Sequence, residues 1–113
     1  MIISKGDIWL VNLNPIKRNN EIGKVRPVLV YQSDNLNHND YPSTIILPLS
    51  TDLIDDVEPI RMRIEKRDKL EKDSDIVITQ IRAIDNSRFI EKLTTLDTNE
   101  LDKINKLLFE VMD

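Results

Sequence analysis

Residues 23–30 read Gly-Lys-Val-Arg-Pro-Val-Leu-Val, in which a charged pair stands directly in front of an apolar run typical of a buried β-strand. Upstream, residues 5–11 (Lys-Gly-Asp-Ile-Trp-Leu-Val) predict a first strand. A polar, basic loop from Asn14 to Glu21 then carries the chain back to Arg26 and Pro27. Packing alone does not explain an arginine at this point, so Arg26 is the first candidate for a functional residue.

The composition is that of an ordinary globular protein. We expect the 113 residues to form one domain, 1–113, because a chain of this length builds a single core. Apolar residues make up 40% and charged residues 32%, and no apolar run approaches the roughly 18 residues of a membrane span. The chain has no cysteine, which excludes disulfides and thiolate metal sites and fits a cytoplasmic protein.

The net charge of −4 argues against a protein that binds nucleic acid over its whole surface. The charge is unevenly distributed, however. Residues 1–50 carry five basic and four acidic side chains, whereas residues 51–113 carry eleven basic and sixteen acidic ones. A basic loop on an acidic body suits a short RNA segment held at one site better than a long duplex.

Five short apolar runs rich in β-branched residues predict strands. They cover Ile8–Leu13, Val28–Gln32, Thr44–Leu49, Ile60–Ile64 and Ile76–Ile81. In the fourth run Arg61 and Arg63 alternate with apolar residues, which predicts one buried and one wet, cationic face. Pro48 lacks a backbone N–H, so an edge position or a bulge is expected there.

Near the C-terminus the apolar spacing becomes helical. Asp97 followed by Glu100 predicts a capping box at the start of an amphipathic helix. A shorter helical turn is expected over Ser87–Leu93, and Glu65–Asp73 is a charged connector. These elements favour a mainly β domain with α, in which a strongly bent antiparallel sheet or small barrel is covered by the final helix.

Several blocks of the chain resemble the MazF/PemK family, the toxins of type II toxin–antitoxin systems. The resemblance rests on Gly6-Asp7-Ile8-Trp9, on Val25-Arg26-Pro27-Val28-Leu29-Val30, on residues 44–51 (Thr-Ile-Ile-Leu-Pro-Leu-Ser-Thr) and on residues 75–85 (Asp-Ile-Val-Ile-Thr-Gln-Ile-Arg-Ala-Ile-Asp). Each block is weak by itself, but their order and the chain length match the family. The resemblance implies an SH3-like small barrel of about five to seven strands with a C-terminal amphipathic helix.

The same resemblance implies a sequence-specific, metal-independent endoribonuclease toxin without a cofactor. Such an enzyme cuts single-stranded RNA, chiefly mRNA, by attack of the ribose 2′-OH on the adjacent phosphate, which leaves a 2′,3′-cyclic phosphate and a 5′-OH end. The expected partners are a second copy of the chain, in a homodimer, and a cognate MazE-like antitoxin with an acidic, disordered C-terminal segment. The basic loop from Lys17 to Arg26 would receive that segment.

Three residues are candidates for catalysis. By its chemistry, Arg26 could pair with Glu21 or Asp34 at the surface, or offer its planar fork of donors to a phosphate. The resemblance favours the second role. It also implies that Ser50 works with Arg26 on the scissile phosphate, with Thr51 as the substitute if the alignment slips by one. Glu21 is a candidate general base, although an exposed loop glutamate also serves as a solubilising charge.

The candidates for RNA binding are the basic side chains of the loop and polar residues of two strand ends. They are Lys17, Arg18, Lys24, Thr51, Asp75 and Gln80. Gln80 and Asp75 carry groups that hydrogen-bond base edges, but polar side chains at such places also satisfy backbone groups. The resemblance implies that this block lines the RNA groove.

Other chemistries find little support in the residues. The single histidine, His38, excludes a two-histidine acid–base pair and lies in a polar, turn-rich segment. Asp52, Asp55, Asp56 and Glu58 match no metal-binding loop and indicate an acidic turn. The chain has only Gly6 and Gly23, too few for a phosphate-binding loop.

Two alternatives from other classes remain open. Toxins of the same fold bind and poison DNA gyrase without catalysis, although this chain lacks the Trp-rich C-terminal end of that branch. An inactive, nucleic-acid-binding regulator is the other alternative, because the residues around Glu21 depart from the family pattern. A test for RNA cleavage distinguishes the endoribonuclease from both of these alternatives.

Overall fold

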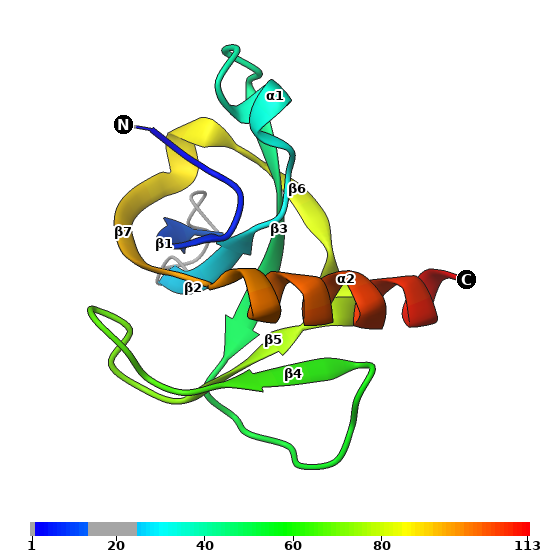
Figure 1. The fold of residues 1–113 in the computed structure, drawn as a ribbon. Helices are drawn as coiled ribbons and strands as arrows, with labels where there is room; N and C mark the ends of the chain where they lie inside the picture. The colour runs from blue at the N-terminus through cyan, green and yellow to red at the C-terminus, as the bar shows by residue number, and fades with distance from the viewer. Residues whose placement is uncertain (1, 14–24) are drawn as a thin grey trace, which may run out of the picture.

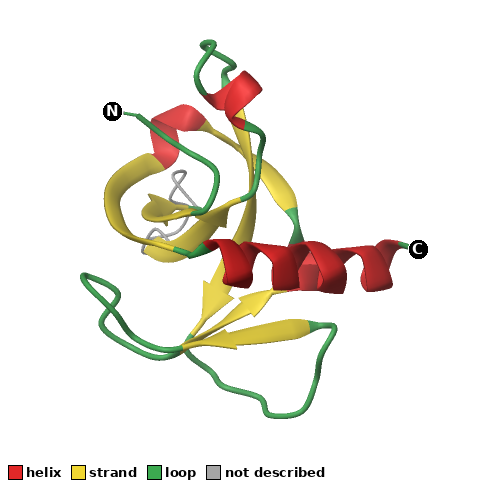
Figure 2. Ribbon diagram, viewed as in Figure 1, coloured by secondary structure: helices red, strands yellow, loops and turns green. Residues whose placement is uncertain are grey.

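The chain folds into a curled antiparallel sheet with a long helix packed against it (Figures 1 and 2). The structure is a computed structural model that describes residues 2–13 and 25–113. The strands are β1 (Asp7–Asn12), β2 (Val25–Val30), β3 (Ser43–Ser50), β4 (Arg61–Ile64), β5 (Ser74–Val77), β6 (Arg82–Asp85) and β7 (Phe89–Thr95). The helices are α1 (Asp34–Asn37), the 3₁₀ turns η1 (Ile78–Gln80) and η2 (Asn86–Arg88), and α2 (Thr98–Met112). Within the described ranges, no helix is both long and apolar enough to cross a membrane.

The strand order is β4-β5-β3-β2-β1-β7, and β6 pairs with β3 outside this path. β3 pairs with β2 along one side; on its other side it pairs first with β6, through Ser43 to Ile46, and then with β5, through Leu49 and Ser50. Pro48 falls between these two partners, although it stands opposite Val28 of β2. The expected edge position for Pro48 is therefore wrong: β3 is an interior strand that tolerates proline where its second neighbour changes.

Two hydrophobic clusters lie on opposite faces of the sheet. Alternate residues of one strand enter different clusters, since side chains of a strand point to opposite faces. Val28 and Val30 pack with Trp9 and Phe89 in one cluster, and Leu29 packs in the other. This burial on both faces explains why the central strands are continuous apolar runs in the sequence.

Helix α2 covers the second of these clusters. Ile104 and Leu107 pack into it, and the predicted capping box is present: Asp97 accepts from the Glu100 amide at 2.8 Å, and Glu100 accepts from the Asp97 amide at 3.0 Å. Arg67 donates two hydrogen bonds of 2.7 Å to the Glu100 carboxylate. The charged connector of residues 65–73 is thereby attached to the start of the helix.

The ion pair of Arg67 and Glu100 predicts acid sensitivity. The hydrogen bonds from Arg67 lower the pKa of Glu100, although burial opposes them. Because the folded-state pKa is depressed, the stabilisation is complete above the unfolded pKa of about 4.3 and is lost as the pH falls through the folded value. We expect Glu100→Gln to reduce the loss of stability below about pH 4, measured by denaturant unfolding. The exposed Glu110→Gln is the control, and equal pH profiles for the two variants would contradict the prediction.

The mainly β fold with a C-terminal helix is confirmed, and the described strands number seven. The expected helical turn over Ser87–Leu93 is wrong, because only η2 precedes strand β7. Ladder irregularities between β1 and β7 disturb the alternation of β7, which is why its sequence lacks the strand pattern. The strand expected to reach Ile81 ends at Val77, where the chain turns into η1.

Gly6 holds the turn before β1 in a conformation that side chains rarely adopt. Its φ is +94°, and an added Cβ would stand 3.0 Å from Leu101 of α2. The Gly6 amide donates to the Val30 carbonyl, and its carbonyl accepts from the Leu96 amide, both at 2.9 Å. These contacts prevent the turn from relaxing.

Gly6→Ala is therefore expected to lower the free energy of unfolding by about 1–3 kcal/mol. Denaturant titration measures this change. An exposed substitution on α2, Asn99→Ala, supplies the control, and a Gly6→Ala protein as stable as the wild type would refute the strain.

Candidate active site at the ends of strands β2 and β3

Arg26 and Ser50 come from neighbouring strands. The ladder between β2 and β3 pairs Val28 with Pro48, Leu29 with Leu47 and Val30 with Ile46. Continued by two residues, this register sets Arg26, in β2, opposite Ser50, in β3. Both are half-buried. Alternation gives them the same face, that of Val28 and Ile46. The two residues singled out from the sequence thus face each other where β3 leaves β2.

Arg26 and Ser50 begin a row of side chains that continues across two further strands. Ser50 pairs with Asp75 of β5, and Asp75 pairs with Arg63 of β4. Residues directly opposite each other share a face of the sheet. One face therefore carries Arg26, Ser50, Asp75 and Arg63 in order.

Asp75 is the buried centre of this row, with 1% of its side chain exposed. Arg63 Nε donates to one carboxylate oxygen at 2.5 Å, and Arg61 Nη1 and the Ile54 amide donate to the other at 3.3 and 2.9 Å. Burial alone would raise the pKa of Asp75, but the hydrogen bonds from Arg63, Ile54 and Arg61 outweigh it and hold the pKa below its usual value. A direct contact of this carboxylate with RNA is not favoured, because all of its donors are protein groups and it is shielded from solvent.

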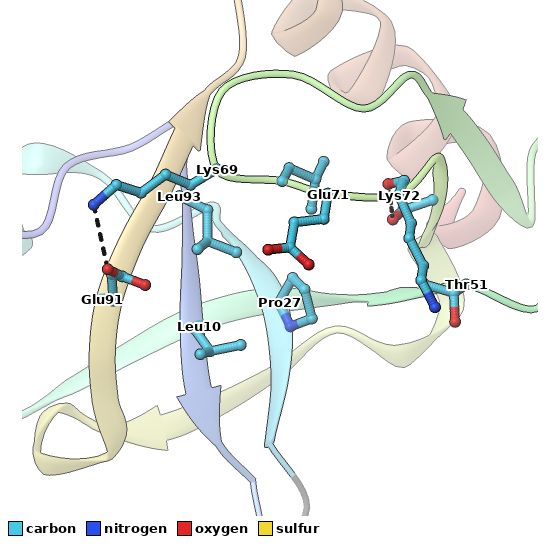
Figure 3. Close-up of a pocket in the computed structure, with 10 residues that line it drawn as sticks. Leu10, Pro27, Thr51, Lys69, Glu71, Lys72, Glu91 and Leu93 are labelled. Atoms are coloured by element: carbon cyan, nitrogen blue, oxygen red, sulfur yellow. Dashed lines mark hydrogen bonds and ion pairs between the residues drawn. The ribbon is translucent and has the colours of Figure 1, made fainter.

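Thr51 faces a different part of the surface. It lines a hollow of about 290 Å³ on the opposite face of β2, together with Leu10, Pro27 and Leu93 (Figure 3). The Lys69–Glu91 ion pair, 3.3 Å long, lies at the rim. Neither Arg26 nor Ser50 lines this hollow. Geometry therefore favours Ser50 over Thr51 as the hydroxyl that works with Arg26.

Gln80 lies in η1, which contacts β3, the strand of Ser50. It is exposed in η1, on the chain that follows β5, whereas Ser50 stands opposite the beginning of β5. Glu21, Lys17, Arg18 and Lys24 lie outside the described residues.

Sequence reasoning identified Arg61 and Arg63 as a cationic face and missed the buried carboxylate that both of them bind. The signal was Asp75 at the start of the strand that pairs with β3, but its arginine partners depend on the β4–β5 register. Among residues 2–13 and 25–113, no three side chains of the His, Asp or Glu type gather as metal ligands would.

Known proteins similar to this chain agree on one family. Residues 4–112 match the profile of the PemK-like, MazF-like toxins of type II toxin–antitoxin systems. Endoribonuclease MazF of Staphylococcus epidermidis is 38% identical over 109 residues, covering 95% of this chain and 88% of the relative. Endoribonuclease EndoA of Bacillus subtilis (strain 168) is 36% identical over 109 residues, covering 96% and 92%.

Solved structures share the fold at low sequence identity. The MazE-MazF crystal structure (Form-II) from Deinococcus radiodurans has a TM-score of 0.80 at 18% identity, over 99% of this chain and 96% of that one. Mycobacterium tuberculosis toxin MazF-mt6 has a TM-score of 0.77 at 13% identity, over 95% and 96%. The family expected from the residues is confirmed: the chain belongs to the PemK-like, MazF-like toxins of type II toxin–antitoxin systems.

Proposed function

We propose that this MazF-like toxin is an endoribonuclease that cuts single-stranded RNA, mRNA in the cell, by means of Arg26 and Ser50. Both curated relatives described above are named endoribonucleases, and each covers most of the chain. The observation that carries the proposal is the β2–β3 register, which by continuation sets Arg26 opposite Ser50 on one face.

The proposed reaction needs no group beyond the RNA and the protein. The ribose 2′-oxygen forms a bond to the adjacent phosphorus, and the bond from phosphorus to the 5′-oxygen breaks. The 2′-OH loses a proton, and the leaving 5′-oxygen gains one. Negative charge grows on the phosphate oxygens during this exchange. A guanidinium and a hydroxyl fixed in advance stabilise that charge better than mobile water does.

Arg26 supplies a planar fork of donors suited to two phosphate oxygens. Ser50 Oγ accepts a hydrogen bond of 3.1 Å from the Asp52 amide, so its own hydrogen remains available for a phosphate oxygen. Glu21 is the proposed base for the 2′-OH, and the basic side chains Lys17, Arg18 and Lys24 are proposed contacts to the RNA backbone. Gln80 is kept as a proposed base contact farther along the RNA.

We also propose that the toxin acts in the cytoplasm as one domain that forms a homodimer. Its cognate partner would be a MazE-like antitoxin. The Deinococcus radiodurans structure described above contains MazE together with a MazF that has the fold of this chain, which supports a partner of that kind. An acidic antitoxin segment would compete with RNA for the same cationic groups.

Cleavage of a long unstructured RNA by the purified, antitoxin-free protein in excess EDTA tests the proposal. Discrete cuts that leave 5′-OH and 2′,3′-cyclic phosphate ends are expected, and the mapped ends give the recognition sequence. If folded, dimeric protein makes no cuts, the activity is wrong and gyrase binding becomes the next experiment.

A further inference from the structure

We infer that Asp75 is a positioning residue for the Ser50 hydroxyl and acts through Arg61 and the turn at residues 50–52. This inference rests on the role proposed for Ser50 in RNA cleavage. It assigns to Asp75 an indirect role in the reaction in place of a contact with RNA.

Three hydrogen bonds, connected through the backbone of Asp52, link the two side chains. Ser50 Oγ accepts from the Asp52 amide at 3.1 Å, and the carbonyl of Asp52 accepts from Arg61 Nη1 at 2.9 Å. The same nitrogen donates to Asp75 Oδ2 at 3.3 Å. Asp75 therefore holds Arg61, Arg61 holds the carbonyl of Asp52, and the amide of the same residue holds the oxygen of Ser50.

The direction of these bonds matters for the chemistry. A serine hydroxyl has one hydrogen to donate and two lone pairs that accept. When the Asp52 amide occupies one lone pair, the hydroxyl is fixed as an acceptor on that side and turns its hydrogen elsewhere. Loss of the turn would free the hydroxyl to rotate, and a donor that must be reoriented during the reaction stabilises charge less.

The same carboxylate secures the rest of the loop that follows Ser50. Its Oδ2 accepts from the Ile54 amide at 2.9 Å. Arg63, bound to Oδ1, also reaches Asp55 through Nη2 at 2.9 Å. Residues 52, 54 and 55 are thus each tied, directly or through one arginine, to a single buried carboxylate.

The energetics indicate that stability alone does not account for this carboxylate. A charge with 1% exposure is costly to remove from water, and apolar residues of similar volume often replace buried ion pairs without loss of stability. The adjacent Ile76 and Val77 show that this part of β5 accepts apolar side chains. The hydrogen bonds of Asp75 serve the loop after Ser50 and the two arginines of β4, which points to positioning.

A double-mutant cycle of Asp75→Asn and Ser50→Ala distinguishes positioning from general structural support. With Ser50 present, Asp75→Asn is expected to lower kcat for a short RNA by up to about 10²-fold, the effect of a misplaced reacting group. With Ser50→Ala, the same substitution is expected to cost nothing further, because its effect passes through the missing hydroxyl. Equal losses in both backgrounds would overturn the inference, because independent effects add.

Two additional variants show whether a loss of activity results from unfolding of the protein. Glu100→Gln breaks a half-buried arginine–carboxylate pair at the start of α2, and this variant is expected to keep the wild-type kcat. Arg61→Ala replaces Asp75→Asn if that variant does not fold, because Arg61 makes the link to Asp52. Circular dichroism and thermal unfolding verify the fold of each protein.

Amide hydrogen exchange gives a readout independent of cleavage. Exchange at Asp52 and Ile54 is expected to accelerate in Asp75→Asn and to stay unchanged in Glu100→Gln, and equal exchange in all proteins would overturn the inference. Failure of the proposed function looks different: wild type and Ser50→Ala would then cleave equally, before Asp75 is changed. An impaired Ser50→Ala protein beside a fully active Asp75→Asn protein would remove the inference and leave the proposed function standing.

Discussion

Replacing Arg26 by alanine is expected to lower the rate of RNA cleavage by about 10³-fold or more and to leave the protein folded. The guanidinium combines a permanent positive charge with two donors in one plane. An arginine that meets a phosphoryl group in its transition state is worth about 10³ to 10⁵ in kcat in other enzymes. Since the charge develops only during reaction, kcat and kcat/KM should fall together.

The fold should survive because the position depends on backbone pairing. Arg26 stands opposite Val11 near the end of the β1–β2 ladder and is half-buried. Alanine keeps the ladder hydrogen bonds, and substitutions on strands span about 1 kcal/mol in intrinsic cost. Circular dichroism and denaturant unfolding verify this point.

Arg26→Lys and Arg67→Ala complete the experiment. Arg26→Lys keeps the charge and loses the fork, so its activity should fall between wild type and Arg26→Ala. Arg67→Ala removes an arginine bound to Glu100, away from the site, and should retain cleavage despite lower stability. Near-full cleavage by Arg26→Ala would exclude this residue from the chemistry.

The interior strands could be predicted because their patterns are local. Val28, Leu29 and Val30 are buried on alternate faces, so the sequence shows an unbroken apolar run. Asp97 and Glu100 predicted the capping box, which depends on residues three positions apart. Such elements need no knowledge of distant partners.

Strand β7 and the environment of Asp75 could not be predicted in this way. The buried and exposed positions of β7 do not alternate, because its ladder with β1 shifts register twice. Asp75 looked like a polar group at a strand end, and only the pairing of β4 with β5 brings Arg63 to it. The resemblance already linked Ser50 to Arg26, but their common face follows from the register of β2 and β3, which the sequence does not show.

That common face leads to a second large expected effect. Ser50→Ala removes one hydroxyl donor and should lower kcat by about 10²- to 10³-fold, the usual cost of deleting a single preplaced donor. Ser50→Thr keeps the hydroxyl, and we expect it to retain most of the activity. Single-turnover cleavage of a short RNA, with the ends identified, measures both.

Two other hydroxyls, those of Ser43 and Thr51, test whether position and face on the sheet matter. Ser43 is half-buried at the opposite end of β3, so Ser43→Ala should cleave at nearly the wild-type rate. Thr51 lines the hollow on the other face, so Thr51→Ala should lose far less activity than Ser50→Ala. The reverse order, a severe loss in Thr51→Ala and a mild one in Ser50→Ala, would mean that the reacting phosphate lies against the other face of β2. Arg26 would then have to act without Ser50, because strand alternation keeps Arg26 on the face of Val28.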